Sequence, residues 1–383
     1  MAGIYIHVPF CASFCTYCDF YSITQLSRKG KYLEALMAEM QQRANFFNGV
    51  PPTTLYFGGG TPSLLSISEL EQVLSTVQRI YLAPYGRTLA DLEEVTLEVN
   101  PDDVTLVKAL AWRRCGISRV SMGVQSFQDR TLKWMGRRHD ARQAQAAYGF
   151  LRQAGFGNIS LDLIFGYCLD TVNDLHSSQE RRRLWSEDLE KMVGLNPEHI
   201  SSYQLSIEPG STLERWVRSG KAVELDAETA AEEYALLQSV LSRSGYHQYE
   251  ISNFARPGYE SRHNRSYWKR VPYLGLGPAA HSFDGKIRFW NPADLTAYAA
   301  GKGAGQEVLT REDVFNEQWM LGLRQSDGLA LSDLDQELLG RVAADLDRLL
   351  SEGLLVKSST GQIKIPSEKL FVSDGIICEL MLD

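Results

Sequence analysis

The sequence predicts an α/β protein whose core is a partial (β/α)6, TIM-like barrel, followed by an appended α+β domain. From residue 3 to about 210, short β-branched and aromatic runs alternate with longer helical patterns. Polar residues stand where these runs end, and 383 residues exceed what one core usually organises. A doubly wound parallel sheet is the alternative closure, but polar strand ends favour a barrel.

The barrel is expected to contain six strands, separated by helices. The strand candidates are Gly3–Val8, Thr53–Phe57, Val95–Val99, Ser118–Val124, Ile159–Phe165 and Ile200–Ile207. Because the carboxyl ends of parallel strands meet at one rim, we expect the active site there. The rim positions are those after Val8 and Phe57, and Glu98, Gln125, Asp162 and Ser206.

The second part of the chain has a different pattern. A helix is expected at Ala227–Leu241, followed by a stretch rich in Tyr, His, Asn and Trp. Two further helices and a hairpin, at Leu331–Leu339, Arg341–Leu350, Leu354–Val356 and Gln362–Ile365, are typical of a winged-helix-like unit. This unit lacks a basic helix, so we expect packing or partner contact rather than DNA binding. The domain boundaries predicted are 1–240 and 241–383.

Composition and charge narrow the function class. The formal net charge of -8 argues against a generic nucleic-acid binder, which needs excess Lys and Arg. The chain start has no basic segment followed by a long apolar one, and no run approaches the roughly 18 apolar residues of a membrane span. Three of the six cysteines crowd together, unlike a disulfide framework. We therefore expect a cytoplasmic protein, with peripheral membrane contact left open.

The crowded cysteines form the motif Cys11-x-x-x-Cys15-x-x-Cys18 directly after the first predicted strand. Three thiolates can hold three irons of a [4Fe-4S] cubane. The fourth iron would then be open to S-adenosylmethionine (SAM), which an electron from the cluster can cleave to a radical. A zinc site is the main alternative, although structural zinc usually takes four protein ligands. Buried inert thiols are a second alternative.

Seven phrases in family order resemble the coproporphyrinogen oxidase-like branch of the radical SAM superfamily. They are Tyr5-Ile-His-Val-Pro-Phe-Cys11, Phe57-Gly-Gly-Gly-Thr-Pro62, Leu97-Glu98-Val-Asn-Pro101, Val120-Ser-Met-Gly-Val-Gln-Ser-Phe127, Asp162-Leu-Ile-Phe-Gly166, Ile207-Glu-Pro-Gly210 and Gly275-Leu-Gly-Pro278. Together they span nearly the whole chain. The resemblance implies a radical SAM barrel with a [4Fe-4S] cluster on Cys11, Cys15 and Cys18.

The resemblance also implies a set of SAM-binding residues. These are Tyr5, Tyr17, Gly59, Gly60, Thr61, Glu98, Gln125, Arg137 and Asp162. Glycines without side chains allow backbone to approach a ligand and offer amides to its methionine part. Asp162 stands in an otherwise apolar strand, where a buried carboxylate needs a partner. Arg137 could instead be a plain surface arginine, and Glu98 a solvated strand end.

Within this branch, two departures favour a heme chaperone over the oxidase. Phe20 stands where the oxidase would have a fourth cysteine, and the cysteine motif begins at residue 11, without the oxidase's longer leading segment. In addition, His263-Asn264-Arg265-Ser266-Tyr267-Trp268 matches the chaperones' His-Asn-x-x-Tyr-Trp signature. An imidazole can ligate heme iron while aromatic rings cover the porphyrin. Alternatively, Tyr267 and Trp268 anchor the core and His263 is hydrogen-bonded in a loop.

The leading hypothesis is therefore a chaperone that carries heme as cargo to apo-hemoproteins of the respiratory chain. His263, Asn264, Tyr267 and Trp268 are the expected heme contacts, no residue is assigned as catalytic, and cluster-driven homodimerisation is left open. The competing hypothesis is an oxygen-independent coproporphyrinogen III oxidase. A third is a radical enzyme acting on another tetrapyrrole or a small metabolite. The segment 167–185 departs from the family pattern, so its loop geometry is not predicted, and Cys168 is expected to be incidental.

Overall fold

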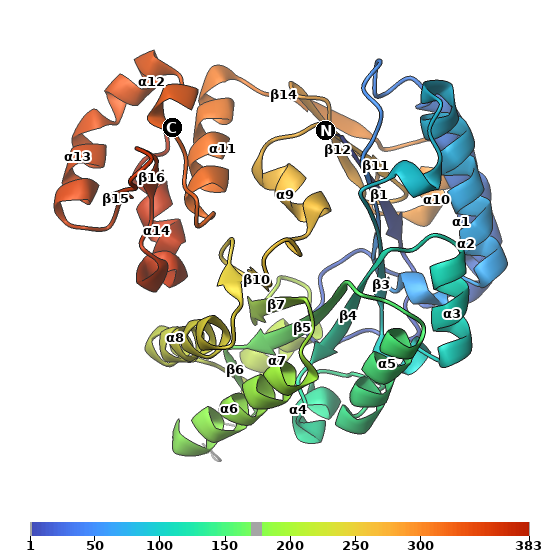
Figure 1. Cartoon of the computed structure of the whole chain (residues 1–383), viewed down its shortest axis with the longest axis horizontal. Coiled ribbons are helices and arrows are strands. Elements are labelled where there is room, and N and C mark those ends of the chain that lie inside the picture. Colours follow the sequence, from blue (N-terminus) through green and yellow to red (C-terminus); the bar gives the residue numbers. More distant parts are fainter. Residues whose placement is uncertain (1, 170–177, 383) are drawn as a thin grey trace.

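The computed structural model of the chain describes residues 2–169 and 178–382 (Figure 1). The six predicted strands are present as β1 (Gly3–Val8), β2 (Thr54–Gly59), β3 (Glu94–Val99), β4 (Arg119–Gln125), β5 (Ile159–Phe165) and β7 (His199–Gln204). Each pairs in parallel with the next in the order β1-β2-β3-β4-β5-β7. A doubly wound sheet would reverse its strand order, so the barrel prediction is confirmed.

The helices that follow these strands cover the outer face of the sheet (Figure 1). They are α1 (Lys29–Gln42), α2 (Ile67–Val77), α3 (Leu106–Arg114), α4 (Asp129–Trp134), α5 (Ala141–Gln153) and α6 (Ser178–Leu195). Local sequence sets where they begin: Ser66 and Glu69 form a capping box at α2, and Asp140 and Gln143 form another at α5. These caps fix the points at which α2 and α5 begin.

The barrel sheet has more strands than the sequence predicts. Beside β1 lies a parallel strand, β11 (Tyr273–Leu276), which the antiparallel strands β12 (His281–Phe283), β13 (Ile287–Trp290) and β14 (Gly305–Val308) extend. Beyond β7 lie β10 (Asn253–Ala255) and β9 (His247–Gln248). The sheet ends at β14 and β9 and so stays open. Strands up to Val308 belong to the barrel sheet, so this sheet continues past the boundary expected at residue 240, which stays a prediction.

Shorter elements connect these parts. They are β6 (Tyr167–Cys168), α7 (Thr212–Arg218), β8 (Val223–Glu224), α8 (Ala227–Arg243), α9 (Arg262–Trp268) and α10 (Leu295–Ala299). In the segment expected to be atypical, β6 pairs with β8, and Cys168 is buried. Residues 170–177 of that segment lie outside the described residues. Among the helices that are described, none is long and apolar enough to cross a membrane.

Helix α11 (Arg311–Leu323) follows the barrel sheet and leads into a C-terminal unit. This unit contains α12 (Gln336–Arg341), α13 (Ala343–Ser351), β15 (Val356–Lys357), β16 (Ile363–Lys364) and α14 (Ser373–Cys378). The expected hairpin is present, since β15 and β16 pair antiparallel. Figure 1 shows that α12 to α14 lie on one side of the molecule, with α11 and then α9 between them and β1. Helix α11 therefore joins this unit to the barrel.

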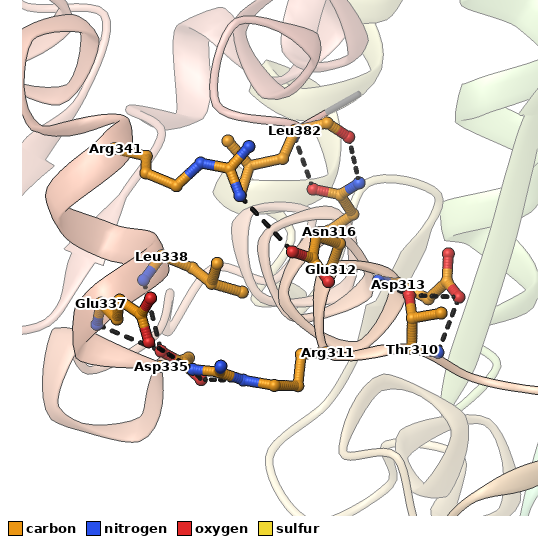
Figure 2. A network of polar contacts seen from close by, with 10 residues as sticks. All are labelled: Thr310, Arg311, Glu312, Asp313, Asn316, Asp335, Glu337, Leu338, Arg341 and Leu382. Atoms are coloured by element: carbon orange, nitrogen blue, oxygen red, sulfur yellow. Dashed lines mark hydrogen bonds and ion pairs between the residues drawn. The ribbon is translucent and has the colours of Figure 1, made fainter.

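A network of polar contacts fastens α11 to the C-terminal unit (Figure 2). Arg311 donates to Asp335 at 2.6 Å and to Glu337 at 3.0 Å. Asn316 makes two hydrogen bonds to the backbone of Leu382, of 2.7 and 2.8 Å. The arginine pairs are exposed and screened by solvent, so each contributes little to stability. The paired amide contact of Asn316 fixes the chain end against α11.

Candidate metal and cofactor site

The three cysteines of the motif lie on the loop that follows β1. All are free thiols and partly exposed. They line one cavity of about 810 Å³ at the carboxyl ends of the barrel strands. Among the described residues, no three His, Cys, Asp or Glu side chains are arranged as ligands of one metal ion. In a cubane, by contrast, each thiolate binds a separate iron.

Hydrogen-bond donors surround the cysteine sulfurs. The Thr61 hydroxyl lies 3.6 Å from Cys11 Sγ, and Arg137 Nη1 lies 3.5 Å from Cys15 Sγ. Burial raises the pKa of the Cys18 thiol to about 11, so without a bound metal this thiol would stay protonated near neutral pH. Metal binding deprotonates a coordinating thiol. Donors aimed at sulfur therefore fit an anionic iron–sulfur cluster.

The glycine run after β2 packs against the cysteine loop. A Cβ on Gly60 would lie 2.8 Å from the Phe10 carbonyl, and Gly59 has a φ of +104°. The amides of Gly60 and Thr61 donate to the carbonyls of Val8 and Phe10 at 2.8 and 2.7 Å. The Gly59 amide donates to Glu98 at 3.2 Å. In this conformation the protein itself uses these amides, and their contact with a ligand stays a prediction.

Two half-buried carboxylates, on the strands β3 and β5, line the cavity. Glu98 on β3 accepts from the Tyr56 hydroxyl at 2.7 Å, and burial raises its pKa to about 7. Asp162 on β5 accepts from the Ser121 hydroxyl at 3.3 Å, and burial raises its pKa to about 6. The cation Arg119, only 1% exposed, opposes that rise for both carboxyls. The partner expected for Asp162 is thus Ser121 together with Arg119.

Arg137 and Gln125 hold the rim of the cavity. Arg137 Nη2 donates to Asn100 at 2.7 Å and to the Gly123 carbonyl at 2.8 Å, so Arg137 is no plain surface arginine. Gln125 ends β4 with a φ of +69°, at a register shift between β4 and β5. A non-glycine residue in this left-handed region stores strain, which is common at binding sites.

The cavity gathers the predicted SAM residues with one exception. Tyr17, Gly59, Gly60, Thr61, Glu98, Gln125, Arg137 and Asp162 all line it beside the cysteines. Tyr5 lies instead at a neighbouring cavity of about 620 Å³, where its hydroxyl is 3.2 Å from His7 Nδ1. Residues 19–21 line both cavities.

The predicted heme sextet is divided among three environments. His263 is 1% exposed, and its Nδ1 and Nε2 lie 2.9 Å from the Thr54 hydroxyl and 2.8 Å from the Tyr267 hydroxyl. Its ring stacks on Tyr56 at 5.1 Å. Both ring nitrogens are therefore occupied in this conformation and neither is free to ligate iron, while the heme role of His263 stays a prediction. Asn264 lines the cysteine cavity, Tyr267 the neighbouring cavity, and Trp268 neither.

Sequence reasoning missed several residues inside the barrel, notably Tyr56, Asn100 and Arg119. The alternation of side chains along a strand could have identified Arg119. Along β4, every second residue lines the cavity: Arg119, Ser121, Gly123 and Gln125. Since alternate strand residues face the same side, a charged residue in step with Gln125 marks the barrel interior.

Comparison with known proteins places these features in a family. Residues 5–180 match the radical SAM superfamily. A heme chaperone HemW from Synechocystis is 37% identical, over 86% of this chain and 79% of that protein. One from Bacillus subtilis is 33% identical, over 94% of both chains. A mitochondrial radical S-adenosyl methionine domain-containing protein 1 from Bos taurus is 31% identical, over 99% of this chain and 87% of that protein.

A solved structure of coproporphyrinogen III oxidase (HemN) from Escherichia coli, described as a radical SAM enzyme, has the same fold. It superimposes with a TM-score of 0.81 over 99% of this chain and 89% of that one, at 24% identity. At this identity the likeness concerns the fold alone. The resemblance stated from the motifs is confirmed.

Proposed function

The chain belongs to the HemW heme chaperone family of the radical SAM superfamily, and we propose that it binds heme and transfers it to apo-hemoproteins of the respiratory chain. The observation that carries this proposal is similarity to heme chaperones along nearly the whole chain, not only in the barrel. Phe20, in place of a fourth cysteine, supports it. The same proposal includes a cytoplasmic location, cluster-dependent homodimerisation and peripheral contact with the membrane.

We propose that Cys11, Cys15 and Cys18 hold a [4Fe-4S] cluster and that SAM occupies the rest of their cavity. The bound cluster would supply an electron to SAM. The protein's own part is positional: Thr61 and Arg137 donate to the cysteine sulfurs. Glu98, held by Tyr56, offers a carboxylate to a ribose hydroxyl or an amine.

Anaerobic heme titration of the cluster-reconstituted protein tests the chaperone proposal. We expect one heme per chain in the absorption titration, followed by transfer to an apo-cytochrome when the two proteins are mixed. Free heme at the same concentration, with bovine serum albumin as a competing heme sink, is the control for unassisted transfer. Failure to bind stoichiometric heme would refute the proposal.

The competing function is oxygen-independent oxidation of coproporphyrinogen III. It is favoured by the fold shared with the Escherichia coli oxidase and by Gln125, Arg137 and Asp162 in the cluster cavity. An anaerobic assay with reductant, SAM and coproporphyrinogen III decides between the two. We expect no protoporphyrinogen, and its formation would favour the oxidase.

A further inference from the structure

We propose that the heme cargo occupies the cavity beside the cluster site, with His281 as an axial ligand of the iron and with Arg270 and Arg288 facing the propionates. This inference rests on the proposed chaperone function and assigns it a location. The exposed His281 on β12 thereby takes the role of iron ligand that the sequence motif suggested for the buried His263.

The cavity has the size and lining that a porphyrin needs. Its volume of about 620 Å³ falls within the roughly 300–1,000 Å³ of small-molecule sites. Aromatic and aliphatic side chains dominate its walls: Tyr267 on α9, Tyr273 and Phe283 on the barrel strands β11 and β12, and Met320 and Leu321 on α11. A flat apolar ring system can therefore insert between the barrel edge and α11.

His281 is the histidine in this cavity best placed to ligate iron. It is exposed at the start of β12, and its ring stacks on Trp290 at 6.1 Å. Among the described residues, no side-chain hydrogen bond occupies its ring nitrogens. His7, the other histidine at this cavity, is 4% exposed and uses Nε2 on the Tyr21 carbonyl at 2.8 Å and Nδ1 on the Tyr5 hydroxyl at 3.2 Å. An imidazole nitrogen is a common axial heme ligand.

Two arginines supply positive charge at the same cavity. Arg270 lies 5.2 Å above the Phe283 ring and pairs with Glu317. Arg288 also pairs with Glu317, and its Nη1 lies 4.0 Å from Glu307. Asp19 and Glu317 are the acidic residues in the lining. A guanidinium has five N–H donors, so both arginines keep donors for propionates after binding Glu317.

The experiment compares heme binding by His281→Ala, Arg288→Gln, His263→Ala and the wild type, with His247→Ala as the matched control. His247 is an exposed histidine on β9, remote from β12 in strand order. We expect His281→Ala to shift the Soret band, to change the spin state seen by electron paramagnetic resonance, and to weaken heme binding at least about tenfold. Arg288→Gln should weaken heme binding but leave the affinity for heme dimethyl ester unchanged. His247→Ala should match the wild type.

The outcomes separate this inference from the proposed function. A wild type that binds no heme overturns both. Normal heme spectra and affinity in His281→Ala and Arg288→Gln overturn the location only, and the chaperone proposal stands. Loss of heme in His263→Ala, measured where circular dichroism shows this variant to be folded and with His281→Ala normal, assigns the cargo to the sextet and likewise overturns the location.

Discussion

At the scale of single residues, His263 is a structural residue in this conformation. Its two nitrogens join Thr54 on β2 to Tyr267 on α9, and its backbone amide donates to Glu94 at 3.2 Å. Burial lowers the pKa of its imidazole to about 3, so the ring is neutral. A neutral imidazole has one donor and one acceptor, and both hydroxyls can complement it.

We therefore predict that His263→Ala destabilises the protein. The change removes a buried ring and leaves the Thr54 and Tyr267 hydroxyls without their partner, which costs about 2 kcal/mol or more. Urea unfolding followed by circular dichroism measures the loss. The exposed His247→Ala should stay within about 0.5 kcal/mol of the wild type. Equal stability of the two variants would contradict the structural role of His263.

Glu98 predicts a pH dependence of stability. Its pKa is raised to about 7 in the folded protein by burial, above the ordinary 4.5. The folded state therefore binds more protons than the unfolded state between these values, and the free energy of unfolding falls as pH rises from about 5 to 8. Burial also raises the pKa values of Asp162, Glu233 and Glu250, so these carboxyls contribute to the same decrease in the free energy of unfolding.

Glu98→Gln isolates the contribution of Glu98. We expect the variant to lose less stability than the wild type between pH 5 and pH 8, because the amide cannot ionise. Urea unfolding at both pH values gives the two differences. Glu93→Gln, an exposed neighbour on the same segment, should retain the full wild-type fall. If Glu98→Gln lost as much stability as the wild type between pH 5 and pH 8, ionisation of Glu98 would not destabilise the folded protein.

At the scale of elements, the turn after β2 explains why the cysteine loop keeps its shape. The backbone of Gly60 and Thr61 bonds the loop on both sides of Pro9. A side chain at Gly60 would contact Val8, Phe10 and their carbonyls at under 3.1 Å. The glycine is thus required by a close approach of two backbones.

We predict that Gly60→Ala impairs cluster assembly. The added methyl group must push the cysteine loop away, which moves Cys11 relative to the other ligands. Iron and acid-labile sulfide per chain after anaerobic reconstitution measure the effect. Gly149→Ala on α5 is the control, since a Cβ there meets nothing within 4 Å. A full cluster content in Gly60→Ala would contradict this account.

The elements that the sequence predicts well are those with a strong local pattern. The six barrel strands are apolar runs followed by polar ends, and their positions are predicted within a few residues. Strands β11 to β14 escape prediction because each has only three or four residues, with Gly275 inside β11 and Gly305 at the start of β14. They gain stability from pairing along the barrel edge, which is a non-local contact. Site residues that belong to a recognisable motif could be predicted from the sequence, whereas Arg119 and His281 could be identified only from their place in the fold.

At the scale of the whole molecule, α11 connects two parts, the C-terminal unit and the barrel. Its first turns bind the C-terminal unit through Arg311 and Asn316 (Figure 2). Its last turns present Glu317, Met320 and Leu321 to the cavity beside the barrel. We therefore infer that the C-terminal unit affects the proposed heme cavity by positioning α11.

We predict that loosening this attachment weakens heme binding. Asn316→Ala removes both hydrogen bonds to Leu382, so α11 is held less firmly and the cavity wall is less ordered. Heme titration should show a lower affinity, and limited proteolysis should release the C-terminal unit faster. Gln318→Ala, which loses one exposed bond to the Asp333 carbonyl, is the milder control. Unchanged affinity in Asn316→Ala would mean that α11 is positioned by its packing alone.

The shared wall of the two cavities predicts coupling between cluster and heme. Residues 19–21 follow Cys18 directly and line both cavities, so a cluster that fixes Cys18 also fixes this wall. Cluster reconstitution should therefore change the heme dissociation constant, and heme should change cluster stability by the same factor.

Phe20, 65% exposed, lines both cavities, whereas Phe14, 59% exposed, lines only the cluster cavity. Phe20→Ala should reduce the coupling in paired heme titrations of apo and reconstituted protein, and Phe14→Ala should preserve it. Equal heme affinity with and without the cluster in the wild type would show that the wall transmits nothing.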